Sequence, residues 1–351
     1  MRESRVPSIL QIPELKSRIL FTLGLLAVFR VGAHIPTPGI DTVALSAFFA
    51  ELTRSGGTIM QFFDLFTGGA LSQLTIFALG IMPYISASII LELMTVVVPH
   101  LERLKKEGES GRKKISQYTR YGTVLLSTIQ GFGIAVGIEQ MTSPTGAAIV
   151  PEPGWGFRLM TVLTLVAGTS FIMWLGEQIT ERGIGNGISL VIFAGIVVGL
   201  PSAIISSFRL LSTGEIQPFV MIFITVLMIA VVGLVVWFEA GQRRIRIQYP
   251  KRVVGRKMAG GQDSHLPLKV NTSGVIPPIF ASSMILFPAT IAQFSSVGWL
   301  KDLSAMLTPP SPFYVLLTIV LIFFFAYFYT AIIFNPMDVA ENLRKYGGFV
   351  P

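Results

Sequence analysis

Long apolar stretches alternate with short polar stretches along almost the whole chain. A bilayer core about 30 Å thick is crossed by a helix of roughly 20 apolar residues. We therefore predict eight membrane-spanning helices, near residues 19–36, 74–95, 121–139, 157–176, 186–205, 217–238, 274–295 and 313–334. The expected fold class is an all-α polytopic membrane protein, a bundle of membrane-spanning helices.

Basic residues gather in alternate connections between these stretches. They are dense before the first stretch and in the connections 96–120 and 239–270. The opposite connections contain few basic residues, namely Arg54, Arg158, Arg209 and Lys301. Because an excess of Lys and Arg marks cytoplasmic loops, we predict that the N-terminus and both long connections are cytoplasmic.

Composition supports a membrane protein. Hydrophobic residues make up 52% of the chain and charged residues 13%, whereas soluble domains contain about 25% charged residues. The mean hydropathy is +0.67. The chain has no Cys, which excludes disulfides, thiolate metal sites and Cys nucleophiles. Orientation accounts for most of the net charge of +8.

One short pattern occurs twice. Residues 80–88 have the sequence GIMPYISAS, and residues 274–282 have the sequence GVIPPIFAS. The copies lie five predicted spans apart, so they run in opposite directions through the bilayer. Paired Gly/Pro-interrupted spans of this kind indicate an inverted repeat around a central pathway. Chance is the alternative, because these residue types are common in membrane helices.

Catalytic patterns are lacking. The histidines His34, His100 and His265 form no H-E-x-x-H pair, and no G-x-S-x-G elbow occurs. The glycine-rich residues 183–187 are typical of a tight turn into the next span. The ionisable residues near membrane depth are Arg30, Glu92, Glu139, Glu177 and Glu239. Nearly all lie close to span ends, where they can reach the interface.

Branched aliphatic residues are the candidates for lining a pathway. Ile81 and Ile85 lie one helical turn apart, as do Ile188 and Ile192, and Ile279 repeats the position of Ile85 in the second copy. Such side chains converging at one depth would form a dry constriction that resists ions. The alternative is that they are ordinary packing residues.

Residues 56–71 are too polar to span a membrane and too aromatic for a solvated loop. Phe62, Phe63 and Phe66 fit one face of a short helix, and Gly68-Gly69 would supply a hinge. Such a helix could fold back and block a pore. Alternatively, it could lie on the outer surface of the membrane.

Five stretches together resemble the SecY family, the central subunits of the bacterial protein-conducting channel. They are residues 77–90, 105–122, 174–188, 241–244 and 265–271. The resemblance covers essentially the whole chain. It implies a channel that passes unfolded secretory polypeptides across the membrane and releases transmembrane segments sideways into the lipid.

The resemblance also implies residue roles. The pore ring would comprise Ile81, Ile85, Ile188, Ile192 and Ile279. The plug, within residues 56–72, would comprise Phe62, Phe63, Asp64, Leu65, Phe66, Gly68 and Gly69. The lateral gate, between spans two and three and spans seven and eight, would carry Ser86, Gln130 and Asn271. The cytoplasmic docking surface would comprise Arg243, Arg244, Arg256, Lys257, Lys105 and Lys106.

Further expectations concern partners and location. The resemblance implies SecE-like and SecG-like small membrane subunits, a SecA-type ATPase, a translating ribosome, and signal sequences and nascent chains as cargo. Contact of the basic loops with ribosomal RNA would be sensitive to salt. It also implies a bacterial plasma (inner) membrane location, contact with membrane lipid and no cofactor.

The resemblance further implies an inverted 5+5 repeat of ten spans. Residues 1–205 would form the N-terminal half and residues 206–351 an incomplete C-terminal half. Since the family continues with a basic turn and two more spans, we expect this sequence to be C-terminally truncated. Glu92 also departs from the family, which commonly has an uncharged polar residue there.

Two other functions are weighed against a polypeptide channel. A secondary transporter would place polar ligands at the membrane midplane, and no such cluster is evident. A membrane-embedded enzyme would need a catalytic constellation, and none of the patterns above supplies one.

Overall fold

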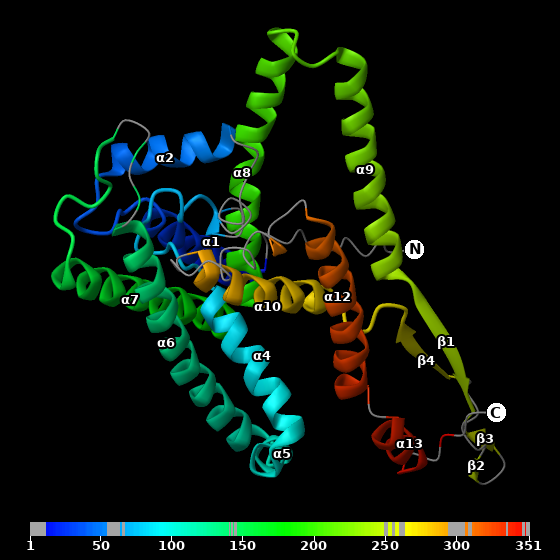
Figure 1. Ribbon diagram of the computed structural model, residues 1–351. Helices are drawn as coiled ribbons and strands as arrows, with labels where there is room; N and C mark the ends of the chain where they lie inside the picture. The colour runs from blue at the N-terminus through cyan, green and yellow to red at the C-terminus, as the bar shows by residue number, and fades with distance from the viewer. Residues whose placement is uncertain are drawn as a thin grey trace. The chain divides into compact units, whose positions relative to one another are not determined.

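The structure is a computed structural model, and it is mostly helical (Figure 1). It describes residues 12–54, 64, 67–139, 141, 143, 146–248, 252–254, 257–259, 264–293, 306–307, 311–334, 336–345 and 348. Internal packing divides the chain into two compact units. Unit 1 comprises Met1–Ile204 and Ser282–Leu316, and unit 2 comprises Ile205–Ala281 and Leu317–Pro351. The expected division at residue 205 into two halves stays a prediction.

The described helices include one for each predicted apolar stretch, in order, and three shorter ones outside the predicted stretches. They are α1 (Pro13–Gly32), α2 (Thr42–Arg54), α4 (Met82–Val97), α5 (Pro99–Lys106), α6 (Glu109–Glu139), α7 (Trp155–Arg182), α8 (Gly187–Ser212), α9 (Pro218–Ala240), α10 (Ile276–Gln293), α12 (Pro312–Ile333) and α13 (Pro336–Lys345). Prolines occupy the first turn of α1, α4, α5 and α9, where a missing N–H leaves no hydrogen bond unmade.

Among the described residues, five helices are long and apolar enough to cross a membrane: α6, α7, α8, α9 and α12. A sixth span results if α4 and α5, which meet at a 99° bend, are counted together. The bend lies at Val98-Pro99, since a residue before proline avoids the helical conformation. Helix α1 is long enough to cross a membrane but carries too many charges to be counted, because Lys16, Arg18 and Arg30 lie within it. The chain is therefore a polytopic helical membrane protein.

The second predicted span is wrong in its first part. Residues 74–81 form buried turns, and α4 begins only at Met82. Gly80 has a φ of +55°, a left-handed conformation that interrupts a helix and that glycine adopts without strain. The turns pair with an earlier loop, where Thr37 N donates to the Leu74 carbonyl and Ile76 N donates to the Ile35 carbonyl, each at 2.9 Å. This pairing satisfies buried backbone groups that a helix would otherwise satisfy.

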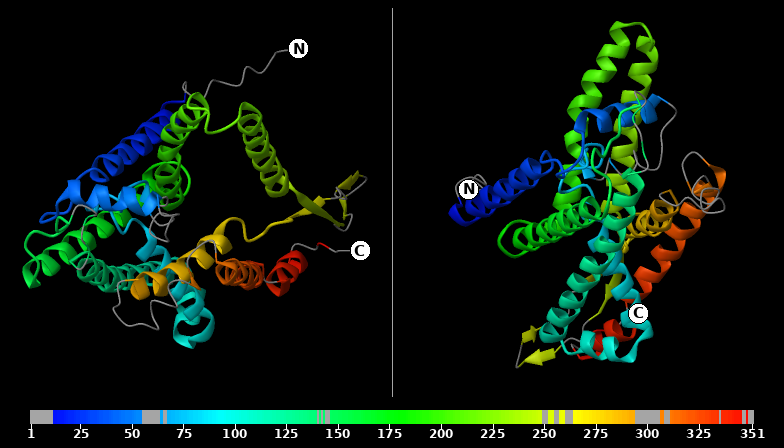
Figure 2. Two further views of the ribbon diagram at one scale, coloured as in Figure 1. Left: turned by 45° about the horizontal axis from the view of Figure 1, so that its top comes forward. Right: turned by 60° about the vertical axis from the view of Figure 1, so that its left-hand side comes forward.

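The core of unit 1 forms where α6 packs against α4 and α7, and α7 against α1 (Figure 2). Phe77 stacks between Phe29 and Phe171, with ring centroids 5.8 and 6.1 Å apart. Gly168 permits this packing, because a Cβ there would collide with the Ile76 carbonyl oxygen. The aromatic layer fixes the turns before α4 against α1 and α7.

The glycine-rich residues 183–187 form the predicted turn into α8. Asn186 Oδ1 accepts hydrogen bonds from the backbone N–H groups of Ile188 at 3.1 Å and Ser189 at 3.2 Å. This is the geometry of a helix N-cap, which satisfies N–H groups that have no partner within the helix. Gly187 lies so close to α7 that a Cβ would collide with the Gly176 carbonyl oxygen. The turn therefore sets both the start and the position of α8.

Part of unit 2 is not helical, which corrects the all-α prediction. Strands β1 (Gln242–Ile247) and β4 (Ser264–Lys269) form an antiparallel ribbon, as do β2 (Arg252–Val254) and β3 (Lys257–Ala259). In β1, Arg244 and Arg246 alternate with Ile245 and Ile247, and a period of two favours a strand. The ribbon begins just after α9, whose 23 residues include none that are buried. A helix apolar on all sides is typical of a membrane span.

The two copies of the repeated pattern have the same local backbone. Gly80 and Gly274 both adopt left-handed conformations, with φ of +55° and +60°. In each copy a helix begins two residues later, at Met82 and at Ile276. The repeated sequence therefore marks a repeated helix start. Ile85 and Ile279 occupy the same position relative to the start of their helices.

Candidate functional site

Four of the five predicted ring residues lie in unit 1, near the starts of two helices. Ile81 and Ile85 lie at the N-terminal end of α4 and are 4% and 7% exposed. Ile188 and Ile192 lie in the first turns of α8 and are half-buried. A Cβ on Gly176 of α7 would lie 3.0 Å from Ile188 Cγ1, so this side chain packs directly on α7. The fifth residue, Ile279, lies in unit 2.

A compact turn lies beside these helix starts and is organised by Asp64. The Oδ1 atom of Asp64 accepts hydrogen bonds from the backbone N–H groups of Leu71 at 2.9 Å and Ser72 at 3.0 Å, and from the Thr67 hydroxyl at 3.2 Å. Gly69 N also donates to the Asp64 carbonyl at 3.0 Å. One carboxylate thus ties the ends of a turn that we call the closing turn, residues 67–72.

The closing turn contacts α8 and the residues just before the start of α4. A Cβ on Gly68 would lie 2.9 Å from the Gly195 carbonyl oxygen of α8. A Cβ on Gly80 would lie 3.1 Å from Thr67 Cγ2. Gly195 follows Ile192 by three residues and Gly80 immediately precedes Ile81. The turn therefore joins the two places in unit 1 where ring isoleucines occur.

Arg30 of α1 holds the closing turn from a third side. Its Nη1 atom donates a hydrogen bond to the Gly68 carbonyl at 2.9 Å. Hydrogen bonds from charged donors are stronger than neutral ones, so this contact fixes the turn against α1. Sequence reasoning placed Arg30 only among ionisable residues near span ends, and did not connect it to the turn.

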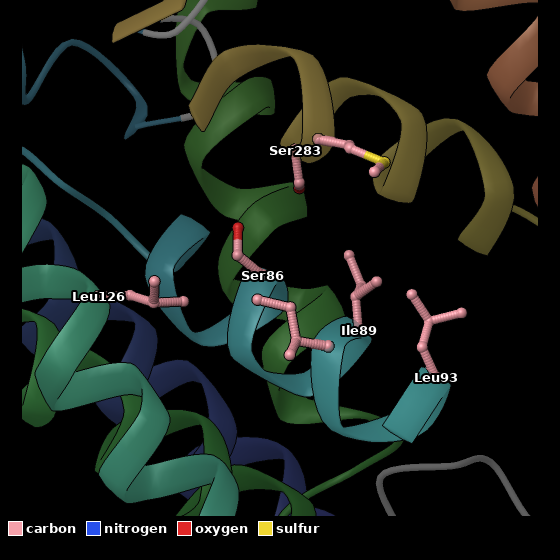
Figure 3. Close-up of a pocket in the computed structure, with 7 residues that line it drawn as sticks. Ser86, Ile89, Leu93, Leu126 and Ser283 are labelled. Carbon is pink, nitrogen blue, oxygen red and sulfur yellow. The ribbon is translucent and has the colours of Figure 1, made fainter. Parts of the chain in front are cut away.

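An apolar groove lies between α4 and residues Ser283 and Met284 of α10, within unit 1 (Figure 3). Its volume is about 190 Å³, and its lining residues are Ser86, Ile89, Ile90, Leu93, Leu126, Ser283 and Met284. The Ser86 and Ser283 side chains extend toward one another from their two helices (Figure 3). Ser86 was a predicted gate residue, whereas Ser283 was missed.

Two polar atoms near this region of unit 1 are buried without a partner in the described part of the chain. They are Ser283 Oγ and Gln130 Oε1, in residues that are 3% and 5% exposed. A buried polar group without a hydrogen bond costs about 1–3 kcal/mol. Such groups are unfavourable in a closed, permanent interface and are satisfied when a polar group enters.

The third predicted gate residue, Asn271, lies in unit 2 and is fully bonded there. Its Nδ2 atom donates to Glu239 Oε1 at 2.8 Å and to the Gly274 carbonyl at 3.2 Å, and its Oδ1 atom accepts from Ser273 Oγ at 2.9 Å. Asn271 thus ties the end of α9 to the glycine that starts α10.

A polar cavity of about 280 Å³ adjoins the ring residue Ile188. Arg120 of α6 and Glu177 of α7 form a two-point ion pair in its wall, with Nε to Oε1 and Nη2 to Oε2 both at 2.9 Å. The other lining residues are Tyr84, Ser116, Thr180, Glu181 and Asn186. The cavity offers hydrogen-bonding groups next to Ile188, one of the predicted ring residues. Among the described residues, no group of His, Cys, Asp or Glu could hold a metal ion.

The predicted docking residues fall into two sets. Arg243 and Arg244 are exposed on neighbouring positions of β1, so they point to opposite faces of the ribbon. Lys105 pairs with Glu92 and Lys106 with Glu102, each with Nζ and Oε1 2.6 Å apart. These lysines are therefore neutralised in part by neighbours. The docking role stays a prediction for both sets.

Some predicted site residues lie outside the described part of the chain. They are Phe62, Phe63, Leu65, Phe66 and Arg256. Lys257 lies in β3, but its side chain is not described. Of the predicted plug residues, the structure therefore describes Asp64, Gly68 and Gly69.

These features define a class of protein: a polytopic helical membrane protein whose candidate site is an apolar pathway rather than a catalytic centre. The sequence profile of the SecY family matches residues 75–351. The chain is 55% identical over 342 residues to the protein translocase subunit SecY of Escherichia coli K12, covering 96% of this chain and 76% of that protein. It is 54% identical to the SecY subunit of Buchnera aphidicola, covering 96% and 95% respectively.

The chain therefore belongs to the SecY family, and it is a protein translocase subunit that transports polypeptides rather than an enzyme. A solved structure described as a protein-conducting channel has the same fold, with a TM-score of 0.52 at 17% identity. That match covers 83% of this chain, which spans 63% of the length of the solved chain.

Proposed function

We propose that Ile81, Ile85, Ile188 and Ile192, with Ile279 of the second repeat copy, form the pore ring of a protein-conducting channel. The observation that carries this proposal is the closing turn, which contacts the helix starts bearing the first four residues. A ring of branched aliphatic side chains excludes ions by dewetting, yet can spread around a polypeptide of any sequence. A transporter for a small solute would instead need fixed polar ligands.

The closing turn acts as the described part of the plug. Its carbonyl at Gly68 is held by Arg30 and its shape by Asp64. Thr67, Ala70 and Leu71 of the turn are buried, so an entering polypeptide must displace packing contacts as well as the hydrogen bond from Arg30. The alternative for this segment is a helix on the outer membrane surface. The contacts of the closing turn with Gly80 and Gly195 argue against that alternative.

The groove between Ser86 and Ser283 is the described part of the lateral gate. The hydroxyl of Ser283, buried and without a partner among the described residues, supports this assignment, because a seam that opens need not satisfy every polar group in its closed form. Hydrogen bonds between membrane helices contribute only about 0.6 kcal/mol on average. A seam of this kind can therefore open when an apolar segment enters from the pore.

The remaining expectations concern the complete protein, its location and its partners. The complete protein would have ten spans in two inverted halves, in a bacterial inner membrane with a cytoplasmic N-terminus. SecE-like and SecG-like subunits would flank it. The exposed Arg243 and Arg244 would contact a SecA-type motor or ribosomal RNA. Repeated helix starts at Gly80 and Gly274 support the two halves.

Crosslinking to a stalled, signal-bearing polypeptide tests the pathway. Photoreactive residues at positions 188 and 192 should capture the polypeptide, whereas one at Ile204, which is 54% exposed on α8, should capture lipid. A photoreactive residue at Ser86 should capture the apolar signal segment. Crosslinking of the polypeptide to position 204 but not to positions 188 and 192 would contradict the proposed pathway.

A further inference from the structure

Helix α9 carries a single charged residue, Glu239, in its last turn. We infer that Glu239 is a positioning residue for α10, and that it acts through Asn271 by fixing the turn from which α10 begins. Asn271 then serves the gate as an anchor of α10 rather than as a contact for cargo. The inference rests on the proposed function of the groove as a lateral gate, because α10 continues to Ser283 and Met284, which line that groove.

The position of Glu239 is unfavourable for α9 considered alone. The negative end of the helix macrodipole lies at the C-terminus, so a carboxylate in the last turn destabilises a helix. An ionisable residue in a membrane helix is explained by the partner that it contacts. The partner here is Asn271, whose Nδ2 atom donates to Glu239 Oε1 at 2.8 Å across 32 residues of sequence.

Asn271 uses all of its hydrogen-bonding capacity within unit 2. Its Nδ2 atom donates to Glu239 and to the Gly274 carbonyl, and its Oδ1 atom accepts from Ser273 Oγ and from Gly274 N. A side-chain amide has two donor hydrogens and two acceptor lone pairs, so none is left over for cargo. Three of these bonds lie inside residues 271–274, and the bond to Glu239 is the one that reaches another helix.

The turn at residues 271–274 fixes the start of α10. Gly274 has a φ of +60°, and α10 begins two residues later, at Ile276. Asn271 bonds both to the N–H and to the carbonyl of Gly274, each at 3.2 Å, so its amide holds the glycine in this left-handed conformation. A displacement of Asn271 therefore displaces the start of α10.

Two neutral contacts hold the same turn. Val270 N donates to the Gly241 carbonyl at 3.1 Å, and Thr272 Oγ1 donates to Thr330 Oγ1 of α12 at 3.2 Å. The bond to Glu239 is shorter and has a carboxylate acceptor, and charge-assisted hydrogen bonds are about twice as strong as neutral ones. Glu239 therefore contributes the strongest of these contacts, and its loss should let α10 move at a lower cost.

Substitutions of Glu239 separate the reach of the side chain from its charge. Glu239→Gln keeps an oxygen at the same distance from Asn271 but removes the charge. Glu239→Asp keeps the charge but withdraws the carboxylate by one methylene, roughly 1.5 Å, which breaks the hydrogen bond. Glu239→Ala removes both. A positioning role predicts that Asp and Ala alter the gate and that Gln does not, whereas a role for charge alone predicts that Gln alters it and Asp does not.

Glu139 provides a matched control in unit 1. It is the last residue of α6, and its carboxylate accepts hydrogen bonds from Gly154 N, at the N-cap of α7, at 2.9 Å and from Arg158 Nε at 2.8 Å. Glu139 thus ties the end of one span to the start of the next, as Glu239 does, but the helix that it positions is α7. Glu139→Ala should lower the thermal unfolding midpoint without changing the gate.

The test compares the export of one protein that carries either an intact signal sequence or one with a shortened apolar segment. Export is measured into vesicles that contain the complete translocase, and the readout is the ratio of the two rates. A gate that opens at a lower cost needs less apolar binding energy. Glu239→Ala and Glu239→Asp should therefore raise the ratio for the shortened signal by about three- to tenfold, the range of one hydrogen bond between membrane helices. Glu239→Gln and Glu139→Ala should leave it within about twofold of the unaltered value.

A double variant tests the route through Asn271. Asn271→Ala should raise the ratio by itself, and adding Glu239→Ala should raise it no further, because residues that act through one contact are not additive. Additive effects would overturn the inference. If Glu239→Ala does not accumulate in the membrane, the comparison of Glu239→Asp with Glu239→Gln decides alone.

Crosslinking from Ser86 in the same vesicles separates the inference from the gate assignment. Capture of the intact signal, with a raised ratio in Glu239→Asp but not in Glu239→Gln or Glu139→Ala, supports the inference. Capture with an unchanged ratio in Glu239→Asp, or with an equal rise in Glu139→Ala, overturns the inference alone. Failure of the unaltered protein to capture the signal overturns the gate assignment and the inference with it.

Discussion

Arg30 on α1 donates a hydrogen bond from Nη1 to the Gly68 carbonyl, at 2.9 Å, across 38 residues of sequence. Gly68 in turn lies against Gly195 of α8. One guanidinium therefore links the first helix to the turn that closes the proposed pore. Holding this turn in place is a physical task distinct from lining the pathway, and it was not evident from the sequence.

Replacing Arg30 should loosen the closing turn. A hydrogen bond to a charged group contributes about 1.5–3 kcal/mol, so Arg30→Gln should raise the open fraction and the resting ion leak of vesicles by about tenfold or more. Arg209→Gln, at the far end of α8, is the control and should leave the leak unchanged. Equal leaks in both variants would contradict the proposed role of Arg30.

Asp64 should matter for closure and not only for stability. It accepts hydrogen bonds from two backbone N–H groups and a hydroxyl, so Asp64→Ala should cost about 1–2 kcal/mol. Asp41 caps α2 in a similar way, by accepting from Val43 N and Ala44 N. Both variants should lower the thermal unfolding midpoint, but only Asp64→Ala should raise ion leak. A leak from Asp41→Ala of the same size would show that general destabilisation is the cause.

Substitutions at two neighbouring glycines distinguish the effect of backbone strain from the effect of contact with α8. Gly68 and Gly69 have φ of +68° and +85°, so alanine at either should cost about 1 kcal/mol. A Cβ at position 68 would also press on the Gly195 carbonyl, whereas one at position 69 meets nothing within 4 Å. Gly68→Ala should therefore increase leak more than Gly69→Ala. The reverse order, measured in the same vesicles, would mean that the turn does not rest on α8.

The ion pair between Arg120 and Glu177 should couple α6 to α7 only modestly. Its geometry is two-pointed, yet Arg120 is 47% exposed, so water screens the interaction and we expect a coupling of less than about 1 kcal/mol. A double-mutant cycle with Arg120→Gln and Glu177→Gln measures it. The same cycle on Lys113 and Glu109, which are 3.5 Å apart and more exposed, should give no measurable coupling. Equal couplings would argue against a structural role for the first pair.

The sequence predicted much of the fold because the bilayer imposes length and polarity on each helix. Residues 183–187 were correctly taken as a turn, since glycines and Asn186 favour a turn and an N-cap. The repeated pattern at Gly80 and Gly274 proved to be a repeated helix start. These features depend on neighbouring residues in the chain, and local patterns record them.

Features that depend on distant contacts were missed or wrong. Residues 74–81 are apolar enough for a span, but pairing with residues 35–37 and stacking of Phe77 on Phe29 hold them as buried turns. The ribbon in loop 239–270 was missed, although the alternation of Arg and Ile along β1 favours a strand. Ser283 was passed over because a serine in an apolar helix carries no sign of whether its hydroxyl is bonded.

The central claim, that isoleucines of α4 and α8 seal a pathway for polypeptides, is tested most directly by resting ion leak together with export. Replacing both Ile85 and Ile188 with Ala should raise the leak severalfold while export continues, because a wider apolar ring admits water but still passes a polypeptide. Ile204→Ala should leave both unchanged. A double variant that stays as tight to ions as the unaltered protein would contradict the claim.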